Sequence, residues 1–233
     1  LYKWLAELTG VKDPYFEIKR QDIKQALVLY PELKKRVMEA PDRLRKAIMF
    51  SLAGNIIDLG AGAVSSWPQS ESLFETEELA LDDYELFTAD LKKARTIVFL
   101  GDNAGETVFD RLLIEQLGRE VIYTVREGPI INDASLEEAR LSGLEEVAKV
   151  VSSGCQAPGT VIKQCSEEFT GILKEADLII SKGQGNYECL EQARGPFYFL
   201  LKAKCEVISR HLKVKQGSLI LARSKNFHPR LEL

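Results

Sequence analysis

Two carboxylates and an amide follow predicted strands, where they could hold a metal ion. Asp102 and Asn103 follow the apolar run 97–100 after a single glycine, and Asp133 lies in the segment that follows the apolar run 121–125. Short apolar runs rich in β-branched and aromatic residues are typical of buried strands. Carboxylate and amide oxygens are the ligands that Mg²⁺ and Mn²⁺ prefer, and no thiol or imidazole accompanies them. These residues therefore indicate a site for a hard divalent cation.

Each of these side chains also has a purely structural explanation. An Asp or Asn before a helix commonly caps it, and Glu106 could close a capping box on Asn103. Asp133 precedes another predicted helix, whose first turn carries Glu137 and Glu138. Taken one at a time, these positions leave helix capping and metal binding equally open.

Two further loops carry groups that suit a phosphate. Ser152, Ser153 and Gly154 end and follow the strand predicted at 147–152. A loop of small residues can present backbone N–H groups to an anion, although it can equally be an ordinary connection between strand and helix. We expect these three residues to bind substrate.

Lys182 follows the strand predicted at 177–181, where its ammonium could contact a phosphoryl oxygen. Gly183 comes next, and the two glycines around Gln184 would let the backbone approach a ligand closely. The order of residues is not that of a Walker A loop. A solvated loop lysine is the structural alternative, but we expect Gly183 and Asn186 to contact substrate.

All of these clusters occupy the same place in the predicted fold. Helical stretches separate most of the predicted strands, which is typical of a mostly parallel sheet with helices on both faces. Such sheets bind ligands at the carboxyl ends of their strands. The predicted strands are 96–100, 120–125, 147–152, 177–181, 206–209 and 218–222.

We therefore predict an α/β fold with two parts. A helical N-terminal domain is predicted over residues 1–70, followed by a three-layer α/β/α Rossmann-like domain over residues 71–233. In the first part, Pro31 is expected to end one helix, and Asp42 is expected to cap a later one. Asn55 and Asp58 lie three residues apart and share a helical face if that helix continues. They are either polar residues at a helix end or a contribution to the edge of the cleft.

The helix predicted from Thr107 to Leu117 is amphipathic. Val108 and Leu112 fall on its apolar face, and Asp110 is expected on its polar face.

The composition narrows the class of protein. A formal net charge of -4 and a pI near 5.5 argue against a nucleic-acid-binding protein. No apolar run approaches the roughly 18 residues of a membrane span, so we expect no membrane partner and a cytoplasmic location. The four cysteines lack zinc-site spacing and are expected to be free thiols. Assembly into a homo-oligomer is left open.

Three segments together resemble a known family. They are 101–106 (GDNAGE), 128–133 (GPIIND) and 182–188 (KGQGNYE). They resemble the damage-control phosphatases, a metal-dependent family long known as a domain of unknown function, number eighty-nine. Residues 13–15 and 53–58 also resemble its stand-alone prokaryotic and archaeal branch, so the resemblance covers almost the whole chain.

The resemblance implies divalent-metal-dependent hydrolysis of phosphate monoesters of small metabolites, especially sugar phosphates. Its cofactor would be Mg²⁺, Mn²⁺, Co²⁺ or Ni²⁺, and its partner a small phosphorylated metabolite. Glu106, Asn55 and Asp58 match further motif positions, which we expect to contact substrate. The catalytic residues that it implies are Asp102, Asn103, Asp133 and Lys182, the first three as metal ligands.

Two other interpretations stay open. A nucleotide- or sugar-phosphate-binding protein without turnover fits a Rossmann-like pattern, although the chain lacks G-x-G-x-x-G. A methyltransferase could use 101–103 as a cofactor loop, but this interpretation explains neither Asp133 nor Lys182.

Overall fold

The computed structural model describes residues 2–54 and 78–232. The helices are α1 (Tyr2–Thr9), α2 (Phe16–Glu39), α3 (Arg43–Gly54), α5 (Tyr84–Lys93), α6 (Thr107–Leu117), α7 (Leu136–Leu141), α8 (Glu167–Glu175), α9 (Gly183–Leu190) and α10 (Glu206–Leu212). The strands are β1 (Leu81–Asp82), β2 (Thr96–Leu100), β3 (Glu120–Val125), β4 (Lys149–Ser152), β5 (Leu178–Lys182), β6 (Phe197–Lys202) and β7 (Leu219–Arg223). Three short 3₁₀ turns are η3 (Ala104–Glu106), η4 (Leu144–Glu146) and η5 (Ile162–Gln164).

The seven strands form one sheet in the order β1-β7-β6-β5-β2-β3-β4. Every neighbouring pair is parallel except β6 and β7. The predicted α/β fold with a mostly parallel sheet is therefore confirmed. The order places β2 and β5 side by side in the middle, so the residues that follow them emerge at the same edge.

The prediction of strands near the C-terminal end was partly wrong. Residues 206–209 were predicted as a strand but belong to α10, and β6 was not predicted. Both faces of β6 are covered, so its apolar residues form an unbroken run instead of an alternating pattern. A buried helix and a buried strand look alike in such a run.

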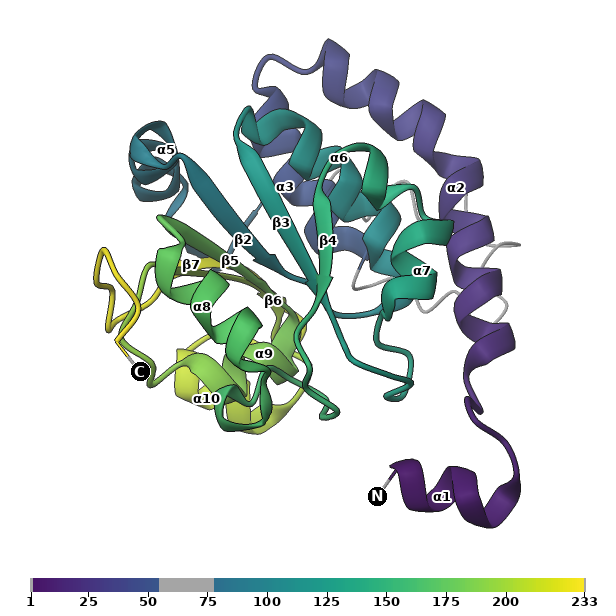
Figure 1. Cartoon of the computed structure of the whole chain (residues 1–233). Helices are drawn as coiled ribbons and strands as arrows, with labels where there is room; N and C mark the ends of the chain where they lie inside the picture. Colours follow the sequence, from purple (N-terminus) through teal and green to yellow (C-terminus); the bar gives the residue numbers. More distant parts are fainter. Residues whose placement is uncertain (1, 55–77, 233) are drawn as a thin grey trace.

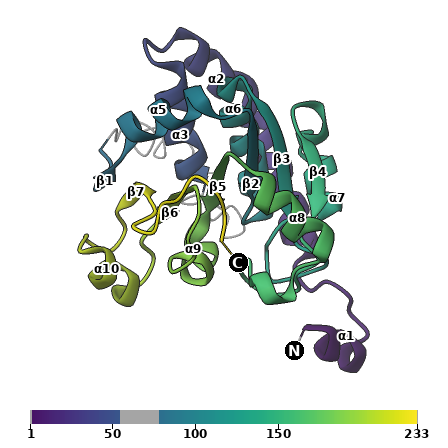
Figure 2. The same ribbon diagram turned by 60° about the vertical axis from the view of Figure 1, so that its left-hand side comes forward.

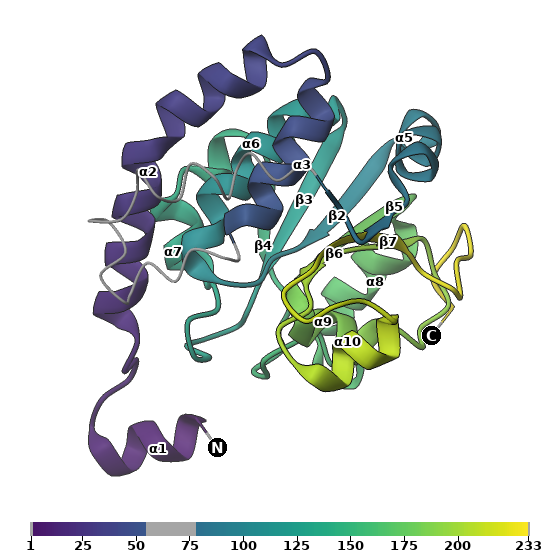
Figure 3. The same cartoon turned by 180° about the vertical axis from the view of Figure 1, so that it is seen from behind.

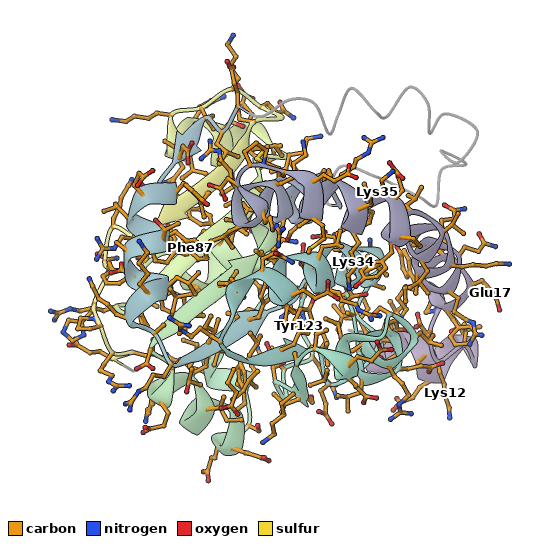
Figure 4. The ribbon with its side chains drawn as sticks, turned by 90° about the horizontal axis from the view of Figure 1, so that it is seen from above. Lys12, Glu17, Lys34, Lys35, Phe87 and Tyr123 are labelled. Carbon is orange, nitrogen blue, oxygen red and sulfur yellow. The ribbon has the colours of Figure 1, made fainter. Side chains whose placement is uncertain are left out.

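Helices cover both faces of the sheet, as expected for three layers. Alternate residues of β2 show this: Ile97 and Phe99 join one apolar cluster with α2, α3 and α6, whereas Val98 and Leu100 join another with α8, α9 and α10. Figure 1 shows α8 in front of the sheet, and α3 comes forward when the molecule is seen from behind in Figure 3. In the view from above, the buried residues Phe87 and Tyr123 are labelled inside the molecule, and Lys12 and Glu17 are labelled at its edge, near the start of α2 (Figure 4).

The long helix α2 runs through Pro31, which was predicted to break it. Proline removes one helical hydrogen bond and costs about 3 kcal/mol in a helix interior. Leu33 and Val37, which follow the proline, are buried in the same cluster as α6. Tertiary packing therefore overrides this local signal. Asp42 caps α3 as predicted, since its Oδ1 accepts a hydrogen bond of 2.9 Å from the backbone N–H of Arg45.

The N-terminal helices share the core of the sheet. Buried residues of α2 and α3 belong to the same apolar cluster as Phe99 and Tyr123. The boundary predicted at residue 70 lies outside the described residues, so the division into two domains stays a prediction. The ribbon of α1 lies at one end of the molecule (Figure 2), where Tyr2 and Ala6 line a pocket together with Gly128 and Ile130 from the loop after β3. Within the described part of the chain, no helix is long and apolar enough to cross a bilayer.

A buried ion pair fastens α2 to α7. The Nζ atom of Lys19 lies 2.6 Å from Asp13 and 2.8 Å from Glu138, and the side chains of Lys19 and Glu138 are 1% and 2% exposed. Glu138 also accepts a hydrogen bond from the backbone N–H of Ser135, the residue that caps α7. Ser135 therefore caps α7, and the helix-capping alternative that was left open for Asp133 is wrong. This pairing holds the segment that carries Asp133 against α2.

We expect Lys19→Met to lower the free energy of unfolding by about 3–5 kcal/mol, because it leaves the Glu138 carboxylate buried without its cation. Urea unfolding of the variant and the unchanged protein measures this difference. Arg20→Met is the matched control, since Arg20 lies 3.7 Å from Glu137 at the surface and should cost about 1 kcal/mol or less. Equal losses in the two variants would contradict the argument.

The loss in Lys19→Met should also depend on pH. Burial alone would raise the pKa of Glu138, but hydrogen bonds from Lys19 and Ser135 lower it. A lowered pKa means that this carboxylate stabilises the fold above its unfolded pKa of about 4.3 and loses that effect as the pH falls through the folded pKa. The stability difference between the two proteins should therefore shrink from pH 7 to pH 3. A constant difference over that range would count against the ion pair.

Candidate active site

Two loops at the carboxyl edge of the sheet are joined by backbone hydrogen bonds. The N–H of Ala134 donates to the carbonyl of Asp102 at 2.9 Å, and the N–H of Ala104 donates to that of Asn132 at 2.8 Å. Asn103 and Asp133 thus form an isolated antiparallel bridge. The structure brings together the three oxygen-bearing side chains that the sequence predicted to share a cation.

Asp102 is buried near two other carboxylates, those of Glu106 and Asp133. Burial and then the charges of Glu106 and Asp133 raise the pKa of its carboxyl to about 8. Gly183 packs directly against it: a Cβ atom built on Gly183 would lie 1.9 Å from Asp102 Oδ2, and the φ of Gly183 is +79°. Only glycine fits here on both counts, so the close backbone approach predicted for Gly183 is toward Asp102. The segment that begins at Gly183 is helix α9 and not the loop that we predicted.

Arg126 was not predicted as a site residue. Its guanidinium bonds to residues of three separate segments at this edge. Its Nε donates to Asp133 at 2.7 Å, its Nη1 to Thr160 at 3.2 Å and its Nη2 to Asn186 at 3.1 Å. Arg126 is only 3% exposed. Its guanidinium therefore sets the position of the Asp133 carboxylate. The position of Arg126 could have indicated a site residue, since it lies just after β3, as Asp102 lies just after β2.

Asn186 is fully buried and ties three strand ends together. Its Nδ2 donates to the carbonyls of Gly101 at 3.0 Å and Lys182 at 2.8 Å, while its Oδ1 accepts from Arg126 and from Thr160. The structure thus shows Asn186 as a support for the site. Its predicted contact with substrate stays a prediction.

Lys182 points into the protein, beneath the edge of the sheet. It is 0% exposed, and its Nζ lies 2.6 Å from Asp110, 2.9 Å from Glu106 and 3.0 Å from the carbonyl of Ser51. Burial alone would lower the pKa of Lys182, but Asp110 and Glu106 raise it, so the side chain is an ammonium. An ammonium has three N–H groups, and all three have acceptors. A phosphoryl contact, which stays a prediction, would have to replace one of them.

The structure also corrects the predicted exposure of Asp110. It was placed on the polar face of its helix, yet it is 0% exposed because α3 packs on α6 and supplies Ser51. Glu106 and Asp110 are four residues apart and share a helical face. That spacing of two carboxylates was the available signal for a common cation, here Lys182.

A pocket of about 490 Å³ opens beside these residues. Asn103 and Glu106 line it from one loop, and Asp22 lines it from α2. Lys202 and Lys204, which end and follow β6, line it as well. They were missed because β6 was missed. The charge of Lys204 lowers the pKa of both Asp102 and Asp133, so its ammonium lies within electrostatic reach of the two carboxylates.

The loop of Ser152, Ser153 and Gly154 was predicted to bind substrate, and backbone N–H groups are the donors that such a loop can offer. The N–H of Gly154 donates to Ser152 Oγ at 3.1 Å, and that of Cys155 donates to Ser153 Oγ at 3.3 Å. These backbone donors are thus already used within the loop. The three residues do not line the 490 Å³ pocket, as far as the described residues show, so their substrate contact stays a prediction. Asn55 and Asp58 lie outside the described residues.

The donor set at this edge fits a hard cation. Asp102, Asn103 and Asp133 offer oxygen atoms on two loops that are hydrogen-bonded to each other, and burial together with the charges of Glu106 and Asp133 raises the pKa of Asp102. A divalent cation would neutralise that negative charge. Across residues 2–54 and 78–232, no group of three His, Cys, Asp or Glu side chains is arranged to hold a metal ion. Two carboxylates with one amide lie outside that definition, and they are the set that we expect to bind.

The chain is similar in sequence to known phosphatases. Residues 1–220 match the family described as the damage-control phosphatase ARMT1-like domain. The chain is 36% identical to the damage-control phosphatase PH1575 of Pyrococcus horikoshii, over 97% of this chain and 78% of that protein. It is 34% identical to a damage-control phosphatase of Archaeoglobus fulgidus, over 94% of this chain and 79% of that protein.

A solved structure extends the similarity to three dimensions. The crystal structure of a DUF89 family protein from Pyrococcus horikoshii superposes with a TM-score of 0.88 and 34% identity, covering 96% of this chain and 80% of that one. The family match spans nearly the whole chain, and the relatives exceed 30% identity over most of their length. The chain therefore belongs to the ARMT1-like, or DUF89, family of damage-control phosphatases.

Proposed function

We propose that this protein is a divalent-metal-dependent phosphatase that hydrolyses phosphate monoesters of small metabolites, such as sugar phosphates. The observation that carries the proposal is the joining of the loops of Asp102, Asn103 and Asp133 at one edge of the sheet, where Asn103 lines a pocket together with Lys202 and Lys204. Family membership supports the reaction class. A volume of about 490 Å³ suits a small metabolite.

The chain's own residues divide the work of such a reaction. Asp102, Asn103 and Asp133 would hold the cation, and Arg126 fixes Asp133 through a hydrogen bond of 2.7 Å. When bound, a divalent cation supplies charge to phosphoryl oxygens and lowers the pKa of a bound water. Lys202 and Lys204 would attract the anionic substrate from the other side of the pocket. Gly183 leaves room for the Asp102 carboxylate.

The first test is hydrolysis of an aryl phosphate with and without Mg²⁺, Mn²⁺, Co²⁺ or Ni²⁺. We expect release of phosphate only with a divalent cation, and a loss of at least about 100-fold in kcat/KM for Asp102→Asn, because a charged ligand is removed. The variant should be at least as stable as the unchanged protein without metal, since it removes one of three crowded carboxylates. Activity without metal, or full activity of the variant, would refute the proposal. Binding of a phosphorylated ligand without release of phosphate would favour a non-catalytic binding protein.

The second test concerns the basic side of the pocket. We expect Lys204→Met to raise KM for a sugar phosphate about 10-fold or more and to change kcat less, because a hydrogen bond to a charged group is lost on binding. Steady-state kinetics at fixed metal concentration measure both constants. Lys215→Met is the control: Lys215 is exposed and lies outside the pocket lining. Similar effects of the two substitutions would mean that only general surface charge matters.

A further inference from the structure

We infer that Asp110 is a positioning residue: by holding Lys182 against Glu106, it sets the direction in which the amide oxygen of Asn103 faces the metal site. This inference rests on the proposed function, because it concerns how that site is arranged. Asp110 lies behind Lys182, and both of its carboxylate oxygens accept hydrogen bonds from protein donors.

Asp110 is held from three other elements. Its Oδ1 accepts hydrogen bonds of 2.6 Å from Lys182 on β5 and 2.6 Å from the Ser51 hydroxyl on α3. Its Oδ2 accepts one of 2.8 Å from the Tyr123 hydroxyl on β3. A carboxylate that is fully buried is costly unless such partners satisfy it. This set of contacts gives Asp110 a defined place between α6 and the sheet.

The contacts continue from Asp110 to the candidate metal ligands. Lys182 donates to Glu106 Oε2 at 2.9 Å, and Glu106 Oε1 accepts from the Nδ2 of Asn103 at 2.6 Å. Since Nδ2 is engaged with Glu106, the Oδ1 atom is the end of the Asn103 amide that faces away from Glu106. Only the oxygen of an amide can bind a hard cation. The line from Asp110 to Asn103 therefore selects the productive orientation of the amide.

Lys182 owes its position to three acceptors, and Asp110 is the nearest of them. The other two are Glu106 and the carbonyl of Ser51. With Asp110 changed to Asn, the side chain keeps one oxygen that can accept from Lys182 but loses its negative charge, so the charge-assisted hydrogen bond becomes a weaker one. The ammonium is then held less firmly, and its hold on Glu106 and Asn103 is weakened.

The experiment compares Asp110→Asn with the unchanged full chain. Mn²⁺ binding is followed by electron paramagnetic resonance of the free ion, and aryl phosphate hydrolysis is measured against Mn²⁺ concentration. We expect the dissociation constant for Mn²⁺ to rise about 10- to 100-fold, the range found for residues that orient metal ligands. At saturating Mn²⁺, KM for the phosphate should change less than about 3-fold, since no substrate contact is removed.

Asp90→Asn is the matched control. Asp90 on α5 also accepts a hydrogen bond of 2.8 Å from a tyrosine hydroxyl, that of Tyr198, but it does not contact Lys182. It should lower stability and leave the Mn²⁺ dissociation constant unchanged. An equal rise in that constant for both variants would overturn the inference, because it would show a general loss of structure.

Ser51→Ala covers the case in which Asp110→Asn does not fold. It removes one donor to Asp110 and keeps every charge and the carbonyl acceptor of Lys182, so Mn²⁺ binding should weaken about 2- to 10-fold. Unchanged Mn²⁺ binding in all folded variants overturns the inference while the unchanged protein still binds Mn²⁺ and releases phosphate. If the unchanged protein neither binds Mn²⁺ nor releases phosphate, the proposed function itself fails.

Discussion

The ion pairs of Lys182 with Asp110 and Glu106 are the contacts on which this structure depends most. They join the end of β5 to α6, and the carbonyl of Ser51 brings α3 to the same ammonium. A buried charge without a partner costs several kcal/mol, so these groups can be buried only together. The same requirement explains why α3 packs so closely on α6. A polar centre thus sets how the helices lie on the sheet.

The candidate site follows from this centre and from the topology. Parallel neighbours β2 and β5 deliver Asp102 and Gly183 to one edge, and the absence of a side chain on Gly183 lets the two segments meet. Backbone hydrogen bonds between the loops after β2 and β3 add Asp133, which Arg126 holds. The result is a cluster of carboxylates held by Arg126 and Lys182, next to a pocket whose lining includes Lys202 and Lys204. Such a grouping of charges suits a divalent cation together with a phosphate.

Two different ion pairs connect the N-terminal helices to this edge. The Lys182 ammonium bonds to the carbonyl of Ser51 on α3 and to Asp110 on α6. The Lys19 ammonium on α2 pairs with Glu138 on α7, the helix that follows Asp133. Both lysines are almost completely buried, and each is shared by two carboxylates. The α2 and α3 helices therefore do more than cover the apolar face of the sheet. They fix the loops that carry the proposed metal ligands.

The sequence by itself determined the sheet class, the central strands and the three oxygen side chains at their ends. These follow from local signals: apolar runs, glycines and polar residues at strand ends. Tertiary structure alone decided that Pro31 lies inside a helix, that Asp110 is buried and that Lys182 faces inward. It also decided where Arg126 and Lys204 lie, at the ends of strands far apart in the chain. The physical reason is that burial and pairing of charges depend on which elements pack together, and neighbours in sequence do not contain that information.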